Sequence, residues 1–348
     1  MAQHILIIGA GIIGSALAYR LSQSGANITL LDPATNGGTA SAASFGWINA
    51  SYENPRPYYT LRRFAMDAWI RIHPALPGLS YTPNGTLYTD FYGIPLETLY
   101  EEHTPWGYPF EWITQAEITA REPNLIFKAN RALFCPIEAQ VLPHIAAQAS
   151  PNAAKTTRVT AHAHGLLIRN GRITGADTSQ GQISADITIL AAGTATATLA
   201  ATAGITVSLN APPGLLIHTK PTAKLIHHTI LTDGLHMQQR PDGTITAGGD
   251  FGGGSINDDP ETGSAKLFNR LQNALKTEAL EFSHYTLGLR PTPSDGLPIV
   301  GSPAPGLYLT VMHSGATLAP GIAELVTAEL MAGHRDVILD PFHPNRFD

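Results

Sequence analysis

The chain has 348 residues, of which 14% are charged and 43% are hydrophobic, and its formal net charge is −6. This length allows two modest domains with a large core, and the composition is that of a globular chain rather than a disordered one. The acidic balance, with no basic run, argues against nucleic acid as a partner. The amino terminus lacks a basic segment and no later apolar run is long enough for a membrane span, so we expect a cytoplasmic protein without membrane insertion.

Residues 4–32 contain a strand, a glycine motif, a helix and a second strand in one unit. The apolar run Ile5–Ile8 predicts a buried parallel strand. It leads into glycines in G-x-G-x-x-G spacing, at Gly9, Gly11 and Gly14. Such glycines permit a tight turn, a close approach of the backbone to a pyrophosphate, and close packing of helix on strand.

The helix after this motif has apolar positions at Ile13, Leu17 and Leu21, and its amino terminus offers free N–H groups to an anion. The second strand, Ile28–Leu31, ends in Asp32, whose carboxylate can accept hydrogen bonds from a pair of ribose hydroxyls. The whole unit predicts dinucleotide binding. The alternative is an α/β turn without a ligand.

The rest of the chain alternates helical and strand-like patterns, and the segment 36–51 is too rich in Gly, Ala and Ser to predict a packed helix. Helices are predicted over 57–76, 96–103, 115–121, 141–149, 195–203, 261–279 and 320–332. Strands are predicted over 86–89, 132–135, 157–163, 166–169, 172–177, 182–190 and 307–311, with an antiparallel block over 214–250 that turns at 241–243.

Strand–helix–strand patterns thus lie at the start, middle and end of the chain, with β-rich blocks between them. This order predicts an α/β fold in which a discontinuous Rossmann-type nucleotide-binding domain holds an inserted α+β substrate domain. We expect residues 1–78, 140–207 and 290–348 in the nucleotide-binding domain. Residues 79–139 and 208–289 are expected in the substrate domain.

Four motifs follow one another in a diagnostic order along essentially the whole chain. They are GAGIIG at 9–14, ITILAAGT at 187–194, GLRPTPSDGLPIVG at 288–301 and LYLTVMHSGATLAPGIAELV at 307–326. In these motifs the chain resembles the superfamily of D-amino-acid oxidase, glycine oxidase and sarcosine oxidase. The resemblance implies FAD rather than NAD and a substrate domain with a large mixed sheet. It also implies oxidation of a C–N bond beside a carboxylate, giving an imine that water hydrolyses.

The same resemblance implies which residues contact FAD. The segment 39–49 would cross the flavin and the pyrophosphate, and because it holds no His or Cys we expect FAD to be bound noncovalently. A helix amino terminus within Gly315–Pro320 would reach the isoalloxazine edge, where negative charge collects on reduction; the alternative is a tight strand-to-helix connection. The expected FAD-contacting residues are Gly9, Gly11, Ile12, Ile13, Gly14, Asp32, Thr39, Ser41, Ala43, Ser44, Val159, Ala192, Gly193, Gly315, Ala316, Thr317 and Leu318.

Three residues are candidates for the substrate side of the site. Arg290 stands in the G-x-R-P motif, whose arginine holds the substrate carboxylate in amino-acid-oxidising members; the alternative is a structural arginine paired with a local acid such as Asp295. His236 stands where glycine oxidase-like sequences often carry a substrate-touching tyrosine, and an ordinary strand histidine is the alternative. His313 precedes the flavin loop, and the segment from there to Pro320 is two residues shorter than in glycine oxidase-like sequences.

The expected substrate is therefore a small carboxylate-bearing amine, with O2 or another acceptor taking the electrons. A 2-hydroxy acid, or a role as the flavin subunit of a larger dehydrogenase, remains an alternative, and an oligomer is compatible with the sequence. We expect no metal, because the histidine pairs 162/164 and 227/228 have no cluster of acids or cysteines near them in sequence. Cys135, the only cysteine, rules out an internal disulfide and is expected to be an inert core thiol.

Overall fold

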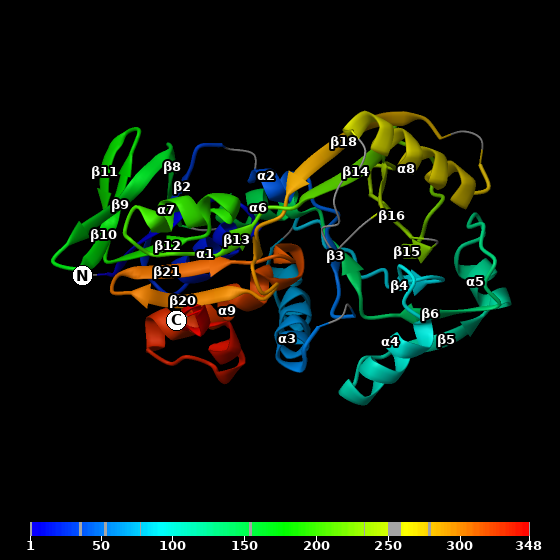
Figure 1. Cartoon of the computed structure of the whole chain (residues 1–348), viewed down its shortest axis with the longest axis horizontal. Coiled ribbons are helices and arrows are strands. Elements are labelled where there is room, and N and C mark those ends of the chain that lie inside the picture. Colours follow the sequence, from blue (N-terminus) through cyan, green and yellow to red (C-terminus); the bar gives the residue numbers. More distant parts are fainter. Residues whose placement is uncertain are drawn as a thin grey trace.

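A computed structural model describes residues 2–34, 37–51, 54–76, 78–152, 155–232, 234–249, 259–277 and 280–347. Among these residues a six-stranded sheet has the order β20-β21-β12-β1-β2-β8, parallel except for the β20–β21 pair. Figure 1 shows this sheet in the half of the molecule that contains both chain ends. Its strands are β1 (His4–Ile8), β2 (Asn27–Asp32), β8 (Thr156–Thr160), β12 (Ile187–Leu190), β20 (Ile299–Ala304) and β21 (Leu307–Val311).

An eight-stranded sheet lies in the other half of the molecule, in the order β18-β14-β17-β16-β15-β4-β6-β5. It is mixed, because β15 and β4 pair in parallel whereas the other neighbours are antiparallel. The expected α/β fold with a large mixed sheet is therefore confirmed. The strands are β4 (Thr86–Tyr88), β5 (Glu111–Thr114), β6 (Arg131–Cys135), β14 (Pro213–Thr219), β15 (Thr229–Thr232), β16 (Leu235–Gln239), β17 (Ile245–Gly248) and β18 (Phe282–Leu289).

Smaller sheets complete the β structure of the described residues. A three-stranded sheet contains β9 (Ala163–Arg169), β10 (Arg172–Thr178) and β11 (Gly181–Ser184). Two short pairs join β3 (Trp47–Ile48) to β7 (Ala139–Gln140) and β13 (Leu209–Asn210) to β19 (Thr292–Pro293).

The helices that position the site are α1 (Ile12–Ser22), α3 (Arg56–Ile72) and α9 (Gly315–Ala332). Helix α9 packs on both α1 and α3, and its contact with α3 is close: a Cβ on Gly321 would lie 2.7 Å from the Cα of Ala65. The other helices are α2 (Thr39–Ala42), α4 (Leu96–His103), α5 (Gln115–Arg121), α6 (Pro143–Asn152), α7 (Thr196–Ala201) and α8 (Pro260–Ala274).

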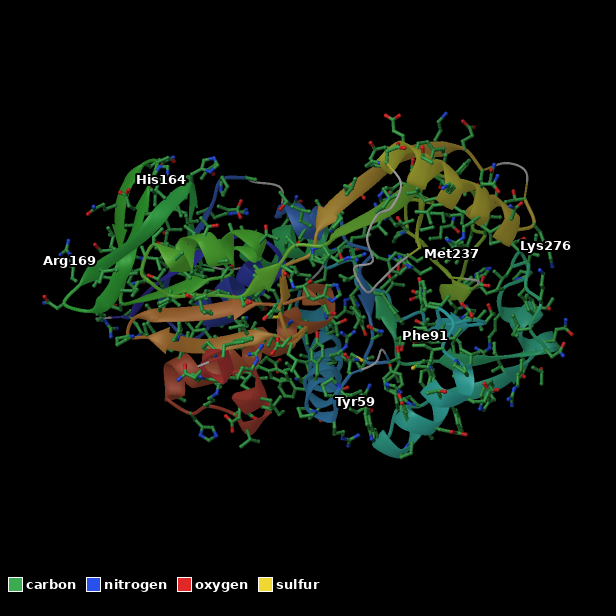
Figure 2. The ribbon with its side chains drawn as sticks, viewed as in Figure 1. Tyr59, Phe91, His164, Arg169, Met237 and Lys276 are labelled. Carbon is green, nitrogen blue, oxygen red and sulfur yellow. The ribbon has the colours of Figure 1, made fainter. Side chains whose placement is uncertain are left out.

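Apolar side chains fill the space between these elements, as the stick view in Figure 2 shows for both halves of the molecule. One core cluster runs from the six-stranded sheet through α1, α3 and α9 to β4, so it joins the two halves. A second cluster lies between the eight-stranded sheet and α8. Cys135 is fully buried in the first cluster and burial raises the pKa of its thiol, in agreement with the predicted inert core cysteine.

Several predicted elements need correction. The run 182–190 forms two strands, β11 and β12, in different sheets, because the chain crosses at Ala185–Asp186 from a partner in β10 to one in β1. Residues 39–42 form the short helix α2, where no helix was expected. Helix α9 begins at Gly315, five residues before the predicted start, so Pro320 lies inside the helix. Strand β18 was not predicted.

Candidate active site

A cavity of about 860 Å³ lies where the carboxyl ends of β1, β2, β12 and β21 face strands β14, β16 and β18. Strands β2 and β12 pair with opposite edges of β1, so the direction of the strand order reverses at β1. The cavity begins at this point. That point is where open parallel sheets bind their ligands. The volume is within the usual range for ligand sites, at its upper end.

The glycine motif forms the turn at the nucleotide end of this cavity. Gly9 has φ +108°, and a Cβ there would lie 2.7 Å from the carbonyl carbon of Ala191, so only glycine fits. A Cβ on Gly14 would overlap the Gly9 carbonyl oxygen, which explains the close packing of α1 on β1. Gly38 adds a second close approach, because a Cβ on it would lie 2.7 Å from the Cα of Gly11. Backbone atoms therefore dominate the surface at the amino terminus of α1.

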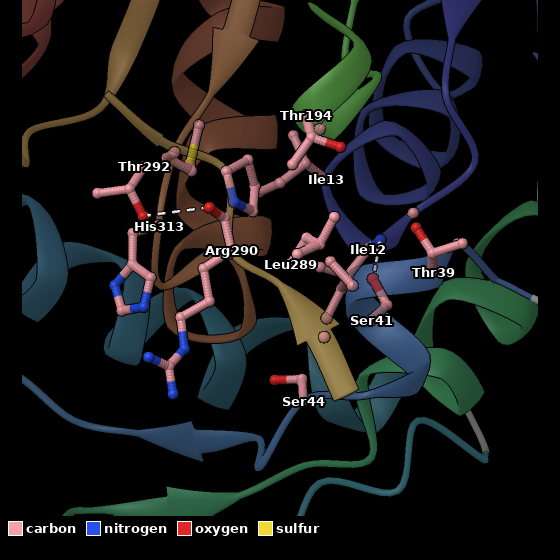
Figure 3. Close-up of a pocket in the computed structure, with 18 of the residues that line it drawn as sticks. Ile12, Ile13, Thr39, Ser41, Ser44, Thr194, Leu289, Arg290, Thr292 and His313 are labelled. Atoms are coloured by element: carbon pink, nitrogen blue, oxygen red, sulfur yellow. Dashed lines mark hydrogen bonds between the residues drawn. The ribbon is translucent and has the colours of Figure 1, made fainter. Parts of the chain in front are cut away.

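Two polar side chains are fixed beside this turn. The Asp32 carboxylate accepts hydrogen bonds from the backbone N–H of Ala10 at 2.7 Å and of Ala34 at 2.8 Å. A carboxylate has about four acceptor positions, so Asp32 can still accept from ribose hydroxyls. The hydroxyl of Ser41 accepts from the N–H of Ile12 at 3.1 Å and keeps its own proton for donation (Figure 3).

Most of the residues expected from the sequence line this one cavity. They are Gly9, Gly11, Ile12, Ile13, Asp32, Thr39, Ser41, Ala43, Ser44, Ala192, Gly193, Gly315 and Ala316, together with His236, Arg290 and His313. Gly14 lies behind the turn, and Val159 packs beside the core cluster that contains Leu31. Thr317 and Leu318 are buried inside α9, where Thr317 Oγ1 donates to the Trp47 carbonyl at 3.2 Å.

Arg290 leaves the end of β18 and its half-buried side chain extends into the cavity, as Figure 3 shows. Its guanidinium packs over Gly214, where a Cβ would lie 2.6 Å from Nη2, so the absence of a side chain at Gly214 makes room for it. Asp295, the alternative partner considered above, forms a bidentate pair with Arg346 at 2.7 and 3.1 Å. Asp295 is thus held by Arg346.

His236 lies on β16 with 1% of its surface exposed. Its Nδ1 is 2.5 Å from the hydroxyl of Tyr92, and Phe45 packs edge-on against the ring at 4.5 Å between centroids. Burial, with a smaller contribution from the positive charge of Arg290, lowers the pKa of His236 well below its ordinary value. The ring is therefore neutral at physiological pH.

The opposite wall is formed by the start of α9, and a residue that the sequence did not reveal lies there. Arg62 of α3 is 5% exposed, and its Nη1 donates to Ser314 Oγ at 2.9 Å. The same hydroxyl lies 3.0 Å from Nδ1 of His313. Arg62 lies with Leu61 and Ala65 on the buried side of α3. An arginine among apolar residues on the buried face of a predicted helix is the feature of the sequence that could have indicated a functional residue here.

A buried carboxyl group, Glu138, lies in the core behind this wall. It accepts hydrogen bonds from Trp47 Nε1 at 2.8 Å and from the hydroxyls of Tyr88 and Tyr108. Burial raises its pKa although these donors oppose the shift. Tyr88 is in turn 2.6 Å from Ser51 Oγ, so the network extends toward the cavity.

Of the histidine pairs considered from the sequence, His162 and His164 line the cavity, whereas His228 contacts a buried acid. His228 Nδ1 lies 2.8 Å from the buried Glu122 carboxylate. Within the described ranges, no group of three or more His, Cys, Asp or Glu is placed to hold a metal ion. Nor does any helix in the part of the chain that the structure describes combine the length and apolarity needed to cross a membrane.

A Rossmann-type sheet with a glycine turn at its cavity is typical of a dinucleotide-binding protein. Family comparison makes the class specific: the profile of the FAD dependent oxidoreductase (DAO) family matches residues 4–329, and the chain belongs to this family. Its cofactor is therefore FAD, as the four motifs implied.

Individual relatives agree with this assignment. A glycine oxidase of Pseudomonas aeruginosa is 27% identical over 366 residues, with 98% of each chain covered. The crystal structure of an L-proline dehydrogenase from P. horikoshii superimposes with a TM-score of 0.88 at 20% identity, over 99% of this chain and 98% of that one. A glycine oxidase structure from Geobacillus kaustophilus gives a TM-score of 0.82 at 21% identity, with 98% of both chains covered.

Proposed function

We propose that this FAD-dependent oxidoreductase oxidises the C–N bond of a small amino acid: a D-amino acid, glycine or an N-methyl amino acid. A hydride leaves the α-carbon for the flavin, the amine becomes an imine, and water hydrolyses the imine. O2 or another acceptor then removes the electrons. The observation that carries the proposal is the place of Arg290, whose half-buried guanidinium lies over Gly214 and lines the same cavity as the glycine turn.

The cavity fits FAD by its surface as well as by its volume. The glycine turn and the amino terminus of α1 would hold the pyrophosphate, and Asp32 would hold the adenosine ribose. Thr39, Ser41 and Ser44 line the stretch between these ends and supply hydroxyl donors. No His or Cys occurs in residues 39–49, which supports a noncovalent cofactor that acid would release into the supernatant. When bound, FAD supplies the two-electron acceptor.

Arg290 would bind the substrate carboxylate through two parallel N–H···O bonds, a geometry that fixes the plane and position of the carboxylate. The α-carbon next to that carboxylate is then held in one place, and orientation of this kind is worth several kcal/mol in rate. A neutral amine is required, because its lone pair becomes the second bond of the imine as the hydride leaves. His236 remains neutral beside Arg290 and so adds no second positive charge to this side of the cavity.

We also propose that the chain is divided into two discontinuous domains. Residues 1–78, 140–207 and 290–348 would form the FAD-binding domain, and residues 79–139 and 208–289 the substrate domain. The six-stranded sheet draws all its strands from the first set, and the eight-stranded sheet draws all its strands from the second. Arg290 follows directly after β18, at the border of the two sets.

Anaerobic mixing of the purified protein with D- and L-amino acids, glycine, N-methyl amino acids and 2-hydroxy acids tests the proposal through bleaching of the flavin band. Arg290→Leu should keep FAD and weaken substrate-dependent bleaching by about 30- to 1,000-fold, since a lost bidentate contact to a sequestered carboxylate costs about 2–4 kcal/mol. Arg290→Lys should recover little, because a point charge cannot reproduce the fork.

Arg169→Leu is the control, since Arg169 is an exposed arginine at the far end of β9, away from the cavity (Figure 2). Unchanged bleaching of Arg290→Leu by every amino acid would refute the anchoring role and favour an amine without a carboxylate. Bleaching by 2-hydroxy acids alone would replace the amino-acid substrate by an alcohol, because Arg290 suits both carboxylates.

A further inference from the structure

Arg62 is a buried cation that the proposed chemistry has not used. It comes from α3, yet it lines the same cavity as Arg290 and His313. All three nitrogens of its guanidinium donate hydrogen bonds: Nε to the Asn49 carbonyl at 2.9 Å, Nη2 to the Asn49 side-chain oxygen, and Nη1 to Ser314 at 2.9 Å. The group is therefore held rigidly between the end of β3 and the start of α9.

Every acceptor of Arg62 is uncharged. Its contacts are two oxygens of Asn49, the hydroxyl of Ser314 and the face of the Tyr58 ring at 5.4 Å. Across the described ranges of the chain, no carboxylate forms an ion pair with Arg62. Burying a cation costs several kcal/mol unless an anion or a dense set of acceptors compensates it. This arrangement leaves the positive charge acting on the cavity.

A buried acid is connected to Arg62, but only at a distance. Asn49 Nδ2 donates to Ser51 Oγ at 3.0 Å, Ser51 contacts Tyr88, and Tyr88 contacts Glu138. The amide of Asn49 separates the two ionisable groups, so the path cannot carry a proton between them. Glu138 thus lies in the core behind the wall, and Arg62 forms the wall itself.

The position of Arg62 gives its charge a specific target. A Cβ on Gly315, the first residue of α9, would lie 3.4 Å from the side chain of Ile13 in α1. Helices α1 and α9 therefore both begin at the cavity. The amino terminus of α9 carries a partial positive charge, and Ser314 immediately before it accepts from Arg62. A full positive charge and a helix amino terminus therefore act on the same end of the cavity.

We propose that Arg62 is the fixed cation that stabilises negative charge on the FAD isoalloxazine when the cofactor is reduced. Its fork to Asn49 and Ser314 holds the charge in place before reduction occurs, so no reorganisation is needed when the anion forms. The role rests on membership of the FAD-dependent family and does not depend on which substrate supplies the hydride.

Sulfite binding measures this role without any turnover. The sulfur lone pair of sulfite forms a bond to N5 of the oxidised ring, and the displaced electron pair leaves an extra negative charge on the ring. The variants are Arg62→Gln, which keeps a donor without the charge, and Arg62→Lys, which keeps the charge without the fork. Arg63→Met is the matched control, since Arg63 is the next residue of α3 and pairs with Asp67 at 3.7 Å.

Arg62→Gln should raise the sulfite dissociation constant about 10- to 100-fold, as expected for loss of a charge a few ångströms away in a medium of intermediate dielectric. The flavin midpoint potential should fall by about 30–60 mV, which is the same fold-change converted for a two-electron couple. Arg62→Lys should stay within about fivefold of the wild type for sulfite, and Arg63→Met should match the wild type.

Equal losses in Arg62→Lys and Arg62→Gln would overturn the proposal, because the fork and not the charge would then matter. An unchanged sulfite constant in Arg62→Gln would overturn it as well. If the Gln variant does not retain FAD, Arg62→Lys decides alone: a loss below about fivefold supports the charge, and a larger loss refutes it. The amino-acid proposal stands or falls separately on Arg290.

Discussion

Trp69 should stabilise the start of α9 by supplying the donor that Pro320 lacks. Pro320 brings no N–H to the carbonyl of Ala316, four residues earlier in the helix. Trp69 Nε1 donates to that carbonyl at 3.0 Å and to the Thr317 carbonyl at 3.1 Å. The indole is 2% exposed and stacks on Tyr81 with centroids 5.7 Å apart, so water cannot replace its N–H.

The perturbation is Trp69→Phe, which keeps an aromatic ring and removes the donor. Leaving a buried carbonyl without a partner costs about 1–3 kcal/mol, and the smaller ring adds about 1 kcal/mol of lost packing. We expect the free energy of unfolding to fall by about 2–4 kcal/mol. The assay is urea unfolding of the holoprotein at a fixed excess of FAD, because bound cofactor contributes to apparent stability.

A double-mutant cycle with Pro320→Ala separates the hydrogen bond from the packing. The alanine substitution would restore a backbone N–H to the Ala316 carbonyl, so Trp69→Phe should then cost about 1 kcal/mol less than in the wild type. The packing loss at Trp69 is the same in both backgrounds and cancels. Costs that add to within about 0.5 kcal/mol would refute the proposed role of Trp69.

Two further outcomes test the cofactor turn and the buried histidines. Gly38→Ala should weaken FAD binding, because the new Cβ would lie 2.7 Å from the Cα of Gly11. Gly25 has a similar positive φ, but a Cβ there would have no atom within 4 Å, so Gly25→Ala should leave the FAD dissociation constant unchanged. Equal losses of FAD affinity in the two variants would contradict the steric argument. Burial lowers the pKa of His218 to about 3, so the unfolded chain binds a proton that the folded chain does not, and stability should fall as pH drops below about 6.5. His218→Asn should reduce the slope of unfolding free energy against pH by up to about 1.4 kcal/mol per unit between about pH 4 and 6. An unaltered slope would show that His218 is protonated in the folded state.

Local patterns predicted the nucleotide end of the molecule well. The strand, glycine turn, helix and acid of residues 4–32 each follow from neighbours in the chain, and β1, α1 and β2 match them. The turn at 241–243 is likewise local, with Gly243 at φ +87° and the N–H of Arg240 bonded to the Thr244 carbonyl. Such features need no knowledge of distant partners.

The wrong predictions of helices and strands occur where a residue far away in the sequence determines the local structure. Helix α9 starts before Pro320 because Trp69, far away in the sequence, supplies the missing donor. Strand β18 escaped prediction because, among the described residues, it is an edge strand with β14 as its one neighbour. Its Leu287 and Leu289 are exposed, so it lacks the alternation of a half-buried strand. Neither fact can be read from a window of neighbouring residues.

Arg62 shows the same dependence at the functional level. Between the end of β21 and the start of α9 only residues 312–314 remain, and this connection holds a histidine and a serine but no arginine or lysine. The resemblance to glycine oxidase-like sequences predicts that the overlapping segment from His313 to Pro320 is two residues shorter than in those sequences. A cation can then reach the wall only from another element, and α3 provides one because Gly321 and Ala65 let the two helices approach closely. The three-residue connection and the buried arginine are thus two parts of one arrangement, and a sequence that shares this connection without an arginine on the helix equivalent to α3 should bind sulfite more weakly.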